Sequence, residues 1–458
     1  MKKGFLLVFL LVFICCNETV DKPSKSGTLI TDVSILDVKT GTVIENQFIA
    51  IDSGKIKRIS SSVENKEIYN LIIDGKGKFA VPGLAEMHAH IPSPPISKEQ
   101  LEQTLFLYLS NGITTIRGML GHPSHLELRR QVQVGEVLSP RIFTSSPSLN
   151  GNTVRTPEEA IDKVTSYQKD GYDFLKIHPG IKRPVFEQVI QTANEVGIPY
   201  AGHVPVGVGI KLALESNYAT VDHVDGFLEG LVPVSENVNP NNNGFFGYNF
   251  AGVVDTTQIK ALVQLSKEHK VWIVPTQSLF ERWFAPISAE ELILEPEMKY
   301  MPVTTLMNWK IRKDQSTGSA TNFDKEQWQK FITIRRQLIK ALQKDGHGIL
   351  LGSDAPQLFN VPGFSIHHEM AGMLRAGMTP LEILQSGTIN PAVFFDREDS
   401  FGQIKEGLDA DLLLVNSNPL NNIEALKKLT GVMIQGKWLD KKTIDKKLKV
   451  IAAYAQNQ

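Results

Sequence analysis

Short apolar runs recur through the middle of the chain, separated by longer stretches of mixed polarity. Several runs end in Gly or Pro, as buried strands do, and they lie at 79–90, 112–117, 141–146, 172–180, 198–205, 220–226, 271–275 and 348–356. The stretches between them, such as 184–196 and 324–344, have the length and polarity of helices. This alternation predicts βα units around a parallel sheet, and eight such strands predict an α/β fold, a TIM barrel over residues 83–392.

The two ends of the chain have a different pattern. Apolar and polar positions alternate, with turns between the runs, at 29–37, 43–51, 55–59, 411–415 and 430–438. Alternation with a period of two predicts antiparallel strands rather than further βα units. The last residues, 441–458, are predicted to form a C-terminal helix with a basic face.

The N-terminus is an apolar leader that starts with two lysines and is too short to span a membrane (residues 1–16). It ends on Cys15 and Cys16, the only cysteines of the chain, where a small-residue cleavage site is missing. This resembles a bacterial lipoprotein signal, with Cys16 or Cys15 as the lipidated residue and the polar stretch 17–27 as a tether. An uncleaved N-terminal anchor is the alternative. Both interpretations predict an exported protein, anchored to a membrane on its periplasmic or cell-surface side.

Charge and composition argue against one class of partner, nucleic acids, and one type of metal ligand, cysteine. The chain has 458 residues and a formal net charge of −1, from 48 basic and 49 acidic residues. Such a balance argues against a nucleic-acid binder. Because both cysteines lie in the leader, no cysteine is available as a metal ligand in the predicted barrel.

Candidate metal ligands stand at the ends of the predicted barrel strands. His88 and His90 are two positions apart in a strand, so their side chains point the same way. Four further strands each end near one potential ligand, namely Lys176, His203, His223 and Asp354. The C-terminal ends of barrel strands share one face, where the sequence therefore predicts a metal centre. Imidazole and carboxylate suit zinc and its neighbours, and a desolvated lysine amine can react with CO₂ to give a carbamate that binds metal.

This set of motifs resembles the metal-dependent amidohydrolase superfamily, and within it the branch of imidazolonepropionase-like proteins and carboxylated-lysine dipeptidases of the prolidase type. The matching segments are 81–90, 111–117, 173–176, 202–205, 222–223, 351–355, 402–413 and 418–420. The resemblance implies a (β/α)8 TIM barrel with a small β-sandwich domain built from both chain ends, residues 28–82 plus 393–440. It implies this distribution of ligands: His88, His90 and Asp354 on a first metal ion, His203 and His223 on a second, and carboxylated Lys176 on both.

The predicted function is that of a binuclear metal-dependent hydrolase. Two divalent ions, zinc or else manganese, cobalt or iron, share a water and lower its pKa from about 15.7 toward about 7. Asp354 then takes the proton and passes it to the leaving amine. The expected substrate is a small molecule with an amide or other C–N bond: a cyclic amide, an N-acyl amino acid or a dipeptide. The alternatives are an esterase, lactonase or phosphotriesterase with the same centre, and a non-catalytic binding lipoprotein.

Three residues are candidates for substrate contacts. His178 lies two positions after Lys176, and it either faces the substrate or packs in the barrel. Arg117 either pairs with a substrate carboxylate or forms a structural salt bridge, and Gln277 is a further candidate. The long segments 237–250 and 283–322 follow the sixth and seventh strands, which predicts a lid or pocket wall, or plain surface loops, on the catalytic side.

Overall fold

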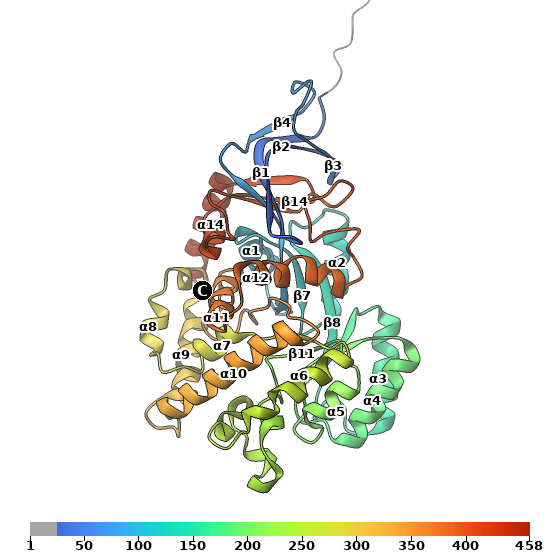
Figure 1. The fold of residues 1–458 in the computed structure, drawn as a ribbon, viewed down its shortest axis with the longest axis vertical. Coiled ribbons are helices and arrows are strands. Elements are labelled where there is room, and N and C mark those ends of the chain that lie inside the picture. Colours follow the sequence, from blue (N-terminus) through green and yellow to red (C-terminus); the bar gives the residue numbers. More distant parts are fainter. Residues whose placement is uncertain (1–24) are drawn as a thin grey trace, which may run out of the picture.

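The computed structural model describes residues 25–458. The predicted leader, with Cys15 and Cys16, and most of the tether lie outside the described residues. Two sheets organise the described chain: a parallel barrel sheet surrounded by helices, and a mixed sheet stacked at one end of it (Figure 1). Within residues 25–458, every helix is too short or too polar to cross a membrane.

Seven parallel strands of the barrel follow one another in chain order around the sheet. They are β6 (Leu84–Ala89), β7 (Ile113–Gly118), β8 (Arg141–Leu149), β9 (Phe174–Ile177), β10 (Tyr200–Gly202), β11 (Thr220–Asp222) and β12 (Trp272–Val274). The predicted eighth segment closes the barrel without forming a regular strand. Isolated parallel bridges join it to both neighbours, Ile349 to Ile273 and Ala355 to Ala89. The predicted parallel α/β barrel is therefore confirmed.

The eighth segment is irregular because its backbone turns where it reaches the site. Asp354 has a left-handed backbone, with φ 64°, yet its N–H still donates to the carbonyl of His88 at 2.9 Å. A Cβ at Gly352 would lie 2.8 Å from the backbone nitrogen of His88, so the segment approaches β6 more closely than another residue would allow. The loss of regular pairing thus brings Asp354 against the strand that carries the two histidines.

Helices cover the outside of the barrel. They are α1 (Lys98–Ser110), α2 (Pro123–Gln133), α3 (Pro157–Asp170), α4 (Arg183–Val196), α5 (Gly209–Glu215), α6 (Ile259–Glu268), α10 (Lys325–Asp345), α11 (Ser365–Arg375), α12 (Pro380–Gly387) and α13 (Ile389–Phe394). Helix α4 illustrates the local rules, because Pro184 stands in its first turn and Gly197 ends it with φ 73°. Its buried residues recur every three or four positions, as on a helix that packs one face on a sheet.

The mixed sheet is built from both ends of the chain, as the resemblance implies. Its strands are β1 (Thr28–Asp37), β2 (Thr42–Asp52), β3 (Lys55–Ser60), β4 (Leu71–Asp74), β5 (Phe79–Pro82), β13 (Leu412–Val415), β14 (Leu429–Ile434) and β15 (Lys437–Asp440). The two ends meet where β5 pairs with β13. Leu412 and Leu414 face the core of this sheet, whereas Leu413 and Val415 face the barrel core. Helix α14 (Lys441–Ala455) follows β15 and forms the predicted C-terminal helix.

Two long insertions follow β11 and β12, and so lie at the C-terminal ends of the barrel strands. The first consists of short 3-10 turns, including Phe245–Phe250. The second contains α7 (Gln277–Glu281), α8 (Ala289–Ile293) and α9 (Val303–Thr317). They pack on each other through aromatic rings, with Tyr248 4.9 Å from Phe284 and 5.8 Å from Phe323 between ring centroids. The insertions are therefore packed structure on the catalytic side rather than plain surface loops.

Candidate metal centre

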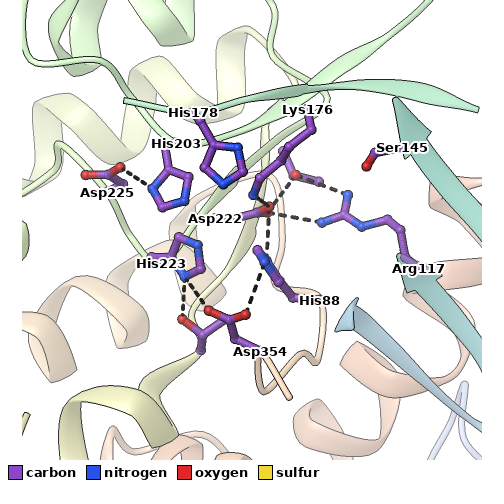
Figure 2. Close-up of polar contacts among 12 residues, drawn as sticks. His88, Arg117, Ser145, Lys176, His178, His203, Asp222, His223, Asp225 and Asp354 are labelled. Carbon is purple, nitrogen blue, oxygen red and sulfur yellow. Dashed lines mark hydrogen bonds and ion pairs between the residues drawn. The ribbon is translucent and has the colours of Figure 1, made fainter. Parts of the chain in front are cut away.

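The six predicted ligands all come from the C-terminal ends of barrel strands. Lys176 is on β9 and His88 on β6, and His90 follows β6 directly. His203 and His223 are the first residues after β10 and β11. Figure 2 shows Lys176, His88, His203, His223 and Asp354 pointing into one region. The structure thus brings together side chains that lie up to 266 positions apart in the sequence, from His88 to Asp354.

His88, His90 and Asp354 form the tightest group. Their ligand atoms lie within 4.8 Å of one another. Oδ1 of Asp354 is 2.6 Å from Nε2 of His90 and 3.5 Å from Nε2 of His88. Two imidazoles and a carboxylate at these separations suit one divalent ion of the zinc type.

His203 and His223 form the second group, and neighbours hold both rings. Their centroids are 4.5 Å apart, and His223 is 4.6 Å from His88. Nδ1 of His203 lies 3.1 Å from Oδ2 of Asp225, and Nδ1 of His223 lies 2.8 Å from the hydroxyl of Thr276. With Nδ1 engaged in each ring, Nε2 is left as the ligand atom, which is the usual arrangement of a metal-binding histidine.

Lys176 is the most unusual residue of the site. It is 0% exposed, and within residues 25–458 its Nζ has no hydrogen-bond partner. Its nearest ion-pair partner is Oδ2 of Asp222, 3.9 Å from Nζ. Burial lowers the pKa of this amine, and an ammonium that is buried without hydrogen bonds is costly. The residues therefore fit a lysine that is carboxylated and bound to metal, because that state replaces the buried ammonium with a carbamate anion, whose charge bound cations would balance and whose oxygens would have partners.

The protonation states favour metal binding. Burial lowers the pKa of His88, His203 and His223 well below the usual value, and the charge of Lys176 acts in the same direction. These rings are therefore neutral near pH 7, the form that binds a metal. Burial also raises the pKa of Asp354, which makes its carboxylate a better proton acceptor.

Mild acid is expected to destabilise the metal-free protein. In the unfolded chain the histidines take up protons below about pH 6.5, whereas the lowered pKa values keep His88, His203 and His223 neutral in the folded state. The stability that they contribute is thus complete above pH 6.5 and is lost as the pH falls below it. Urea unfolding with chelator present should show a decrease of up to about 1.4 kcal/mol per histidine for each pH unit. A His203→Gln variant should have a shallower dependence, and an equal slope in both proteins would contradict this account.

Two of the three candidate substrate-binding residues are engaged in contacts within the protein, and their binding of a substrate stays a prediction. Arg117 is fully buried and donates to Oδ1 of Asp222 at 3.1 Å, so the structural salt bridge is the alternative that holds. Gln277 is also fully buried, donating to Glu281 and accepting a hydrogen bond from Arg335. Both side chains are as deeply buried as the candidate ligands His88 and Lys176.

His178 is placed beside the candidate ligands. Its ring stacks on His203 with 4.9 Å between centroids, and its Nδ1 lies 2.7 Å from the hydroxyl of Ser148. The residue is partly exposed, and burial lowers its pKa to about 2, so the ring is neutral. A contact between His178 and a substrate stays a prediction.

Sequence reasoning missed the residues that orient the ligands. Asp225 could have been predicted from the sequence, because it is a carboxylate two positions after the candidate ligand His223. Thr276 could not have been predicted in this way, since it reaches His223 only through the left-handed turn, φ 45°, that follows β12. His223 and Asp354 also have positive φ values, 65° and 64°. Such rarely populated backbone conformations cluster at functional sites.

Comparisons with known proteins found both similar sequences and similar structures. Ochratoxinase of Aspergillus niger is 34% identical over 393 residues, covering 77% of this chain and 73% of that protein. Adenine deaminase of Desulforamulus reducens is 23% identical over 390 residues, and the chain spans about half of that relative's length, 54%. Bottromycin amidohydrolase superposes with a TM-score of 0.71 at 20% identity, covering 93% of this chain and 90% of that one. A Xaa-Pro dipeptidase structure superposes with a TM-score of 0.65 at 19% identity, covering 91% of this chain and 100% of that one. These two structural similarities show a shared fold.

The family model covers most of the chain. The amidohydrolase family matches residues 79–439, which include the whole barrel, the six candidate ligands and the C-terminal strands of the mixed sheet. The chain belongs to the amidohydrolase family.

Proposed function

We propose that this protein is a binuclear metal-dependent hydrolase that cleaves the C–N bond of a small amide. The observation that carries the proposal is the buried amine of Lys176, which has no hydrogen-bond partner within residues 25–458 and shares its region with candidate imidazole ligands. The nearest ion-pair partner of this amine, Oδ2 of Asp222, is 3.9 Å away, which compensates poorly for the burial of an ammonium. The buried lysine is accounted for if its end is carboxylated and bridges two cations.

The donor set divides naturally between two ions. His88, His90 and Asp354 would hold one, His203 and His223 the other, and carboxylated Lys176 would bind both. When bound, such ions supply a nucleophile at neutral pH and polarise the carbonyl of the substrate. Zinc suits these nitrogen and oxygen ligands, and manganese, cobalt and iron fit them as well.

Asp354 is the proposed proton carrier. Its carboxylate stands between the two groups of histidines, with Oδ1 near His90 and Oδ2 3.8 Å from Nδ1 of His223. Its raised pKa allows it to accept a proton from the attacking water and to hold it near the leaving nitrogen. The amine then departs with that proton, and the carboxylate is regenerated.

The surrounding residues keep this arrangement fixed. Asp225 and Thr276 orient the rings of His203 and His223, and the pairing with Arg117 fixes Asp222 beneath Lys176. Such partners of metal ligands commonly set affinity and activity. We propose a cyclic amide, an N-acyl amino acid or a dipeptide as substrate, a choice that the names of the relatives support, since they include a Xaa-Pro dipeptidase.

A library of dipeptides and N-acyl amino acids, assayed for release of the amine, tests the proposal. We expect hydrolysis by purified protein that contains about two divalent ions per chain. Incubation with a strong chelator should remove the ions and lower activity by at least about 100-fold, and zinc, manganese or cobalt should restore it. Activity on esters or lactones alone would overturn the amide assignment. Full activity in metal-free protein would overturn the metal centre.

A further inference from the structure

We propose that Phe246 determines specificity at this site, by selecting substrates with a large apolar side chain beside the scissile amide. The inference rests on the proposed function, because it assigns a substrate class to the same site. It comes from the first long insertion, in which the ring of Phe246 reaches His203 and His223.

The ring of Phe246 lies directly at the candidate metal ligands. Its centroid is 5.4 Å from that of His223 and 5.8 Å from that of His203. On its other side it meets Phe280 edge to face at 5.2 Å. Phe280 is fully buried, whereas Phe246 is partly exposed. An apolar surface is therefore presented to solvent beside the histidines.

The backbone of Phe246 adopts a conformation that a bulky residue rarely takes. Its φ and ψ are 52° and 48°, in the left-handed region, and Gly247 follows with φ 83°. A Cβ at Gly247 would lie 2.8 Å from Cδ2 of Leu228, so the turn is pressed closely onto the first residues of the same insertion. Such strain persists where the surroundings enforce it, and it is frequent at ligand-binding positions.

Polar and aromatic contacts on both sides hold the turn in place. The hydroxyl of Tyr248 accepts from the N–H of Asp324 at 2.7 Å, and Gln327 donates to the carbonyl of Tyr248 at 2.9 Å. Before the turn, Asn243 donates to Glu229 at 2.8 Å. The ring of Phe246 is thus a fixed wall of the site.

His203 also has polar neighbours. His178 stacks on it, and the hydroxyl of Ser148 lies near both Nδ1 of His178 and Nδ2 of Asn150. A substrate at the centre consequently has both hydrogen-bonding groups and an aromatic face beside it. A large apolar side chain placed on Phe246 leaves water and gains favourable ring contacts, which a glycine residue cannot do.

Binding of two small hydroxamates to the zinc-loaded protein tests the inference without turnover. We expect L-phenylalanine hydroxamate to bind about 10- to 100-fold more tightly than glycine hydroxamate in the wild type, measured by calorimetry. Phe246→Gly removes the ring and relieves the strained backbone, and should bring the ratio of dissociation constants close to one. Phe246→Leu keeps an apolar side chain and should retain part of the preference.

Phe245→Ala is the matched control, because it also removes a ring from the turn. The ring of Phe245 lies 4.5 Å from Phe284 and 5.0 Å from Trp283, and within residues 25–458 it stacks on none of the histidines. The ring of Phe245 also meets that of Phe246 edge to face at 4.9 Å, but Phe280 and the left-handed turn still hold Phe246, so this variant should keep most of the wild-type preference. Circular dichroism and zinc content establish that each variant is folded and loaded.

The outcomes separate this inference from the proposed function. A preference that survives in Phe246→Gly, or a wild type that binds both hydroxamates equally or neither of them, would overturn the role of Phe246. A wild type with a Phe246-dependent preference but no hydrolysis of any amide would uphold the inference and reject the function. Amide hydrolysis at equal rates for substrates with large and small side chains would uphold the proposed function and reject the role of Phe246.

Discussion

Asp354→Asn is expected to lower kcat by about 10²- to 10⁴-fold while the protein stays folded. The amide keeps the shape of the carboxyl group and one oxygen that can face His90, so the backbone turn at residue 354 is preserved. It cannot accept the proton of the attacking water or return it to the leaving amine. Because the other five candidate ligands are intact, most of the bound metal should remain.

Asp173→Asn is the matched control. Asp173 is a partly buried carboxylate, but it precedes β9 at the opposite end of the barrel, where it pairs with Arg129 at 2.7 Å. That variant should lose some stability and keep its kcat. Metal content, measured with kcat at several pH values, distinguishes loss of the proton carrier from loss of the ions. An Asp354→Asn enzyme within about tenfold of the wild type would rule out this role for Asp354.

Much of the barrel was predictable because its information is local. Each strand is an apolar run that ends in a turn, and the His88-Ala-His90 spacing alone orients two side chains together. Once the strands are arranged as a parallel barrel, their C-terminal ends must share a face, which brings Lys176, His203 and His223 together. The convergence of the candidate ligands was therefore accessible without coordinates.

Local pattern does not tell how deep a side chain lies, so the buried contacts of some candidate residues could not be predicted. Arg117 stands on β7 and points into the barrel interior below the ligands, where Asp222 neutralises it. Gln277 is in the first turn of α7 and is held by Arg335. Which polar side chains are enclosed depends on contacts between segments far apart in the chain. The same holds for Thr276 and Phe246, whose positions follow from left-handed turns with no sequence signature beyond a neighbouring glycine at residue 247.

Lys176→Met is expected to stabilise the metal-free protein and abolish its function. The substitution replaces a fully buried ammonium, which has no hydrogen bond within residues 25–458, by an apolar side chain of similar length. Burial of a polar group without a hydrogen bond costs about 1–3 kcal/mol, and its removal should raise the free energy of unfolding by up to that amount. Asp222 keeps Arg117 as its partner, so the change leaves no lone carboxylate. Metal content should fall below the roughly two ions per chain expected of the wild type, and hydrolysis should fall below detection, because nothing remains to bridge the ions.

The chain supplies a matched control in Lys313, a second lysine that is almost completely buried, with 2% exposure. Its Nζ donates to the carbonyls of Trp283 and Ala285, both at 2.7 Å, and to the hydroxyl of Thr317 at 3.1 Å. Lys313→Met leaves these acceptors without their donor and should lower the free energy of unfolding by about 1–3 kcal/mol. Urea unfolding in the presence of chelator compares the two variants, and metal analysis follows occupancy. If both variants lost stability to the same extent and Lys176→Met still bound its ions, Lys176 would be an ordinary structural lysine and the proposed centre would lose its bridging ligand.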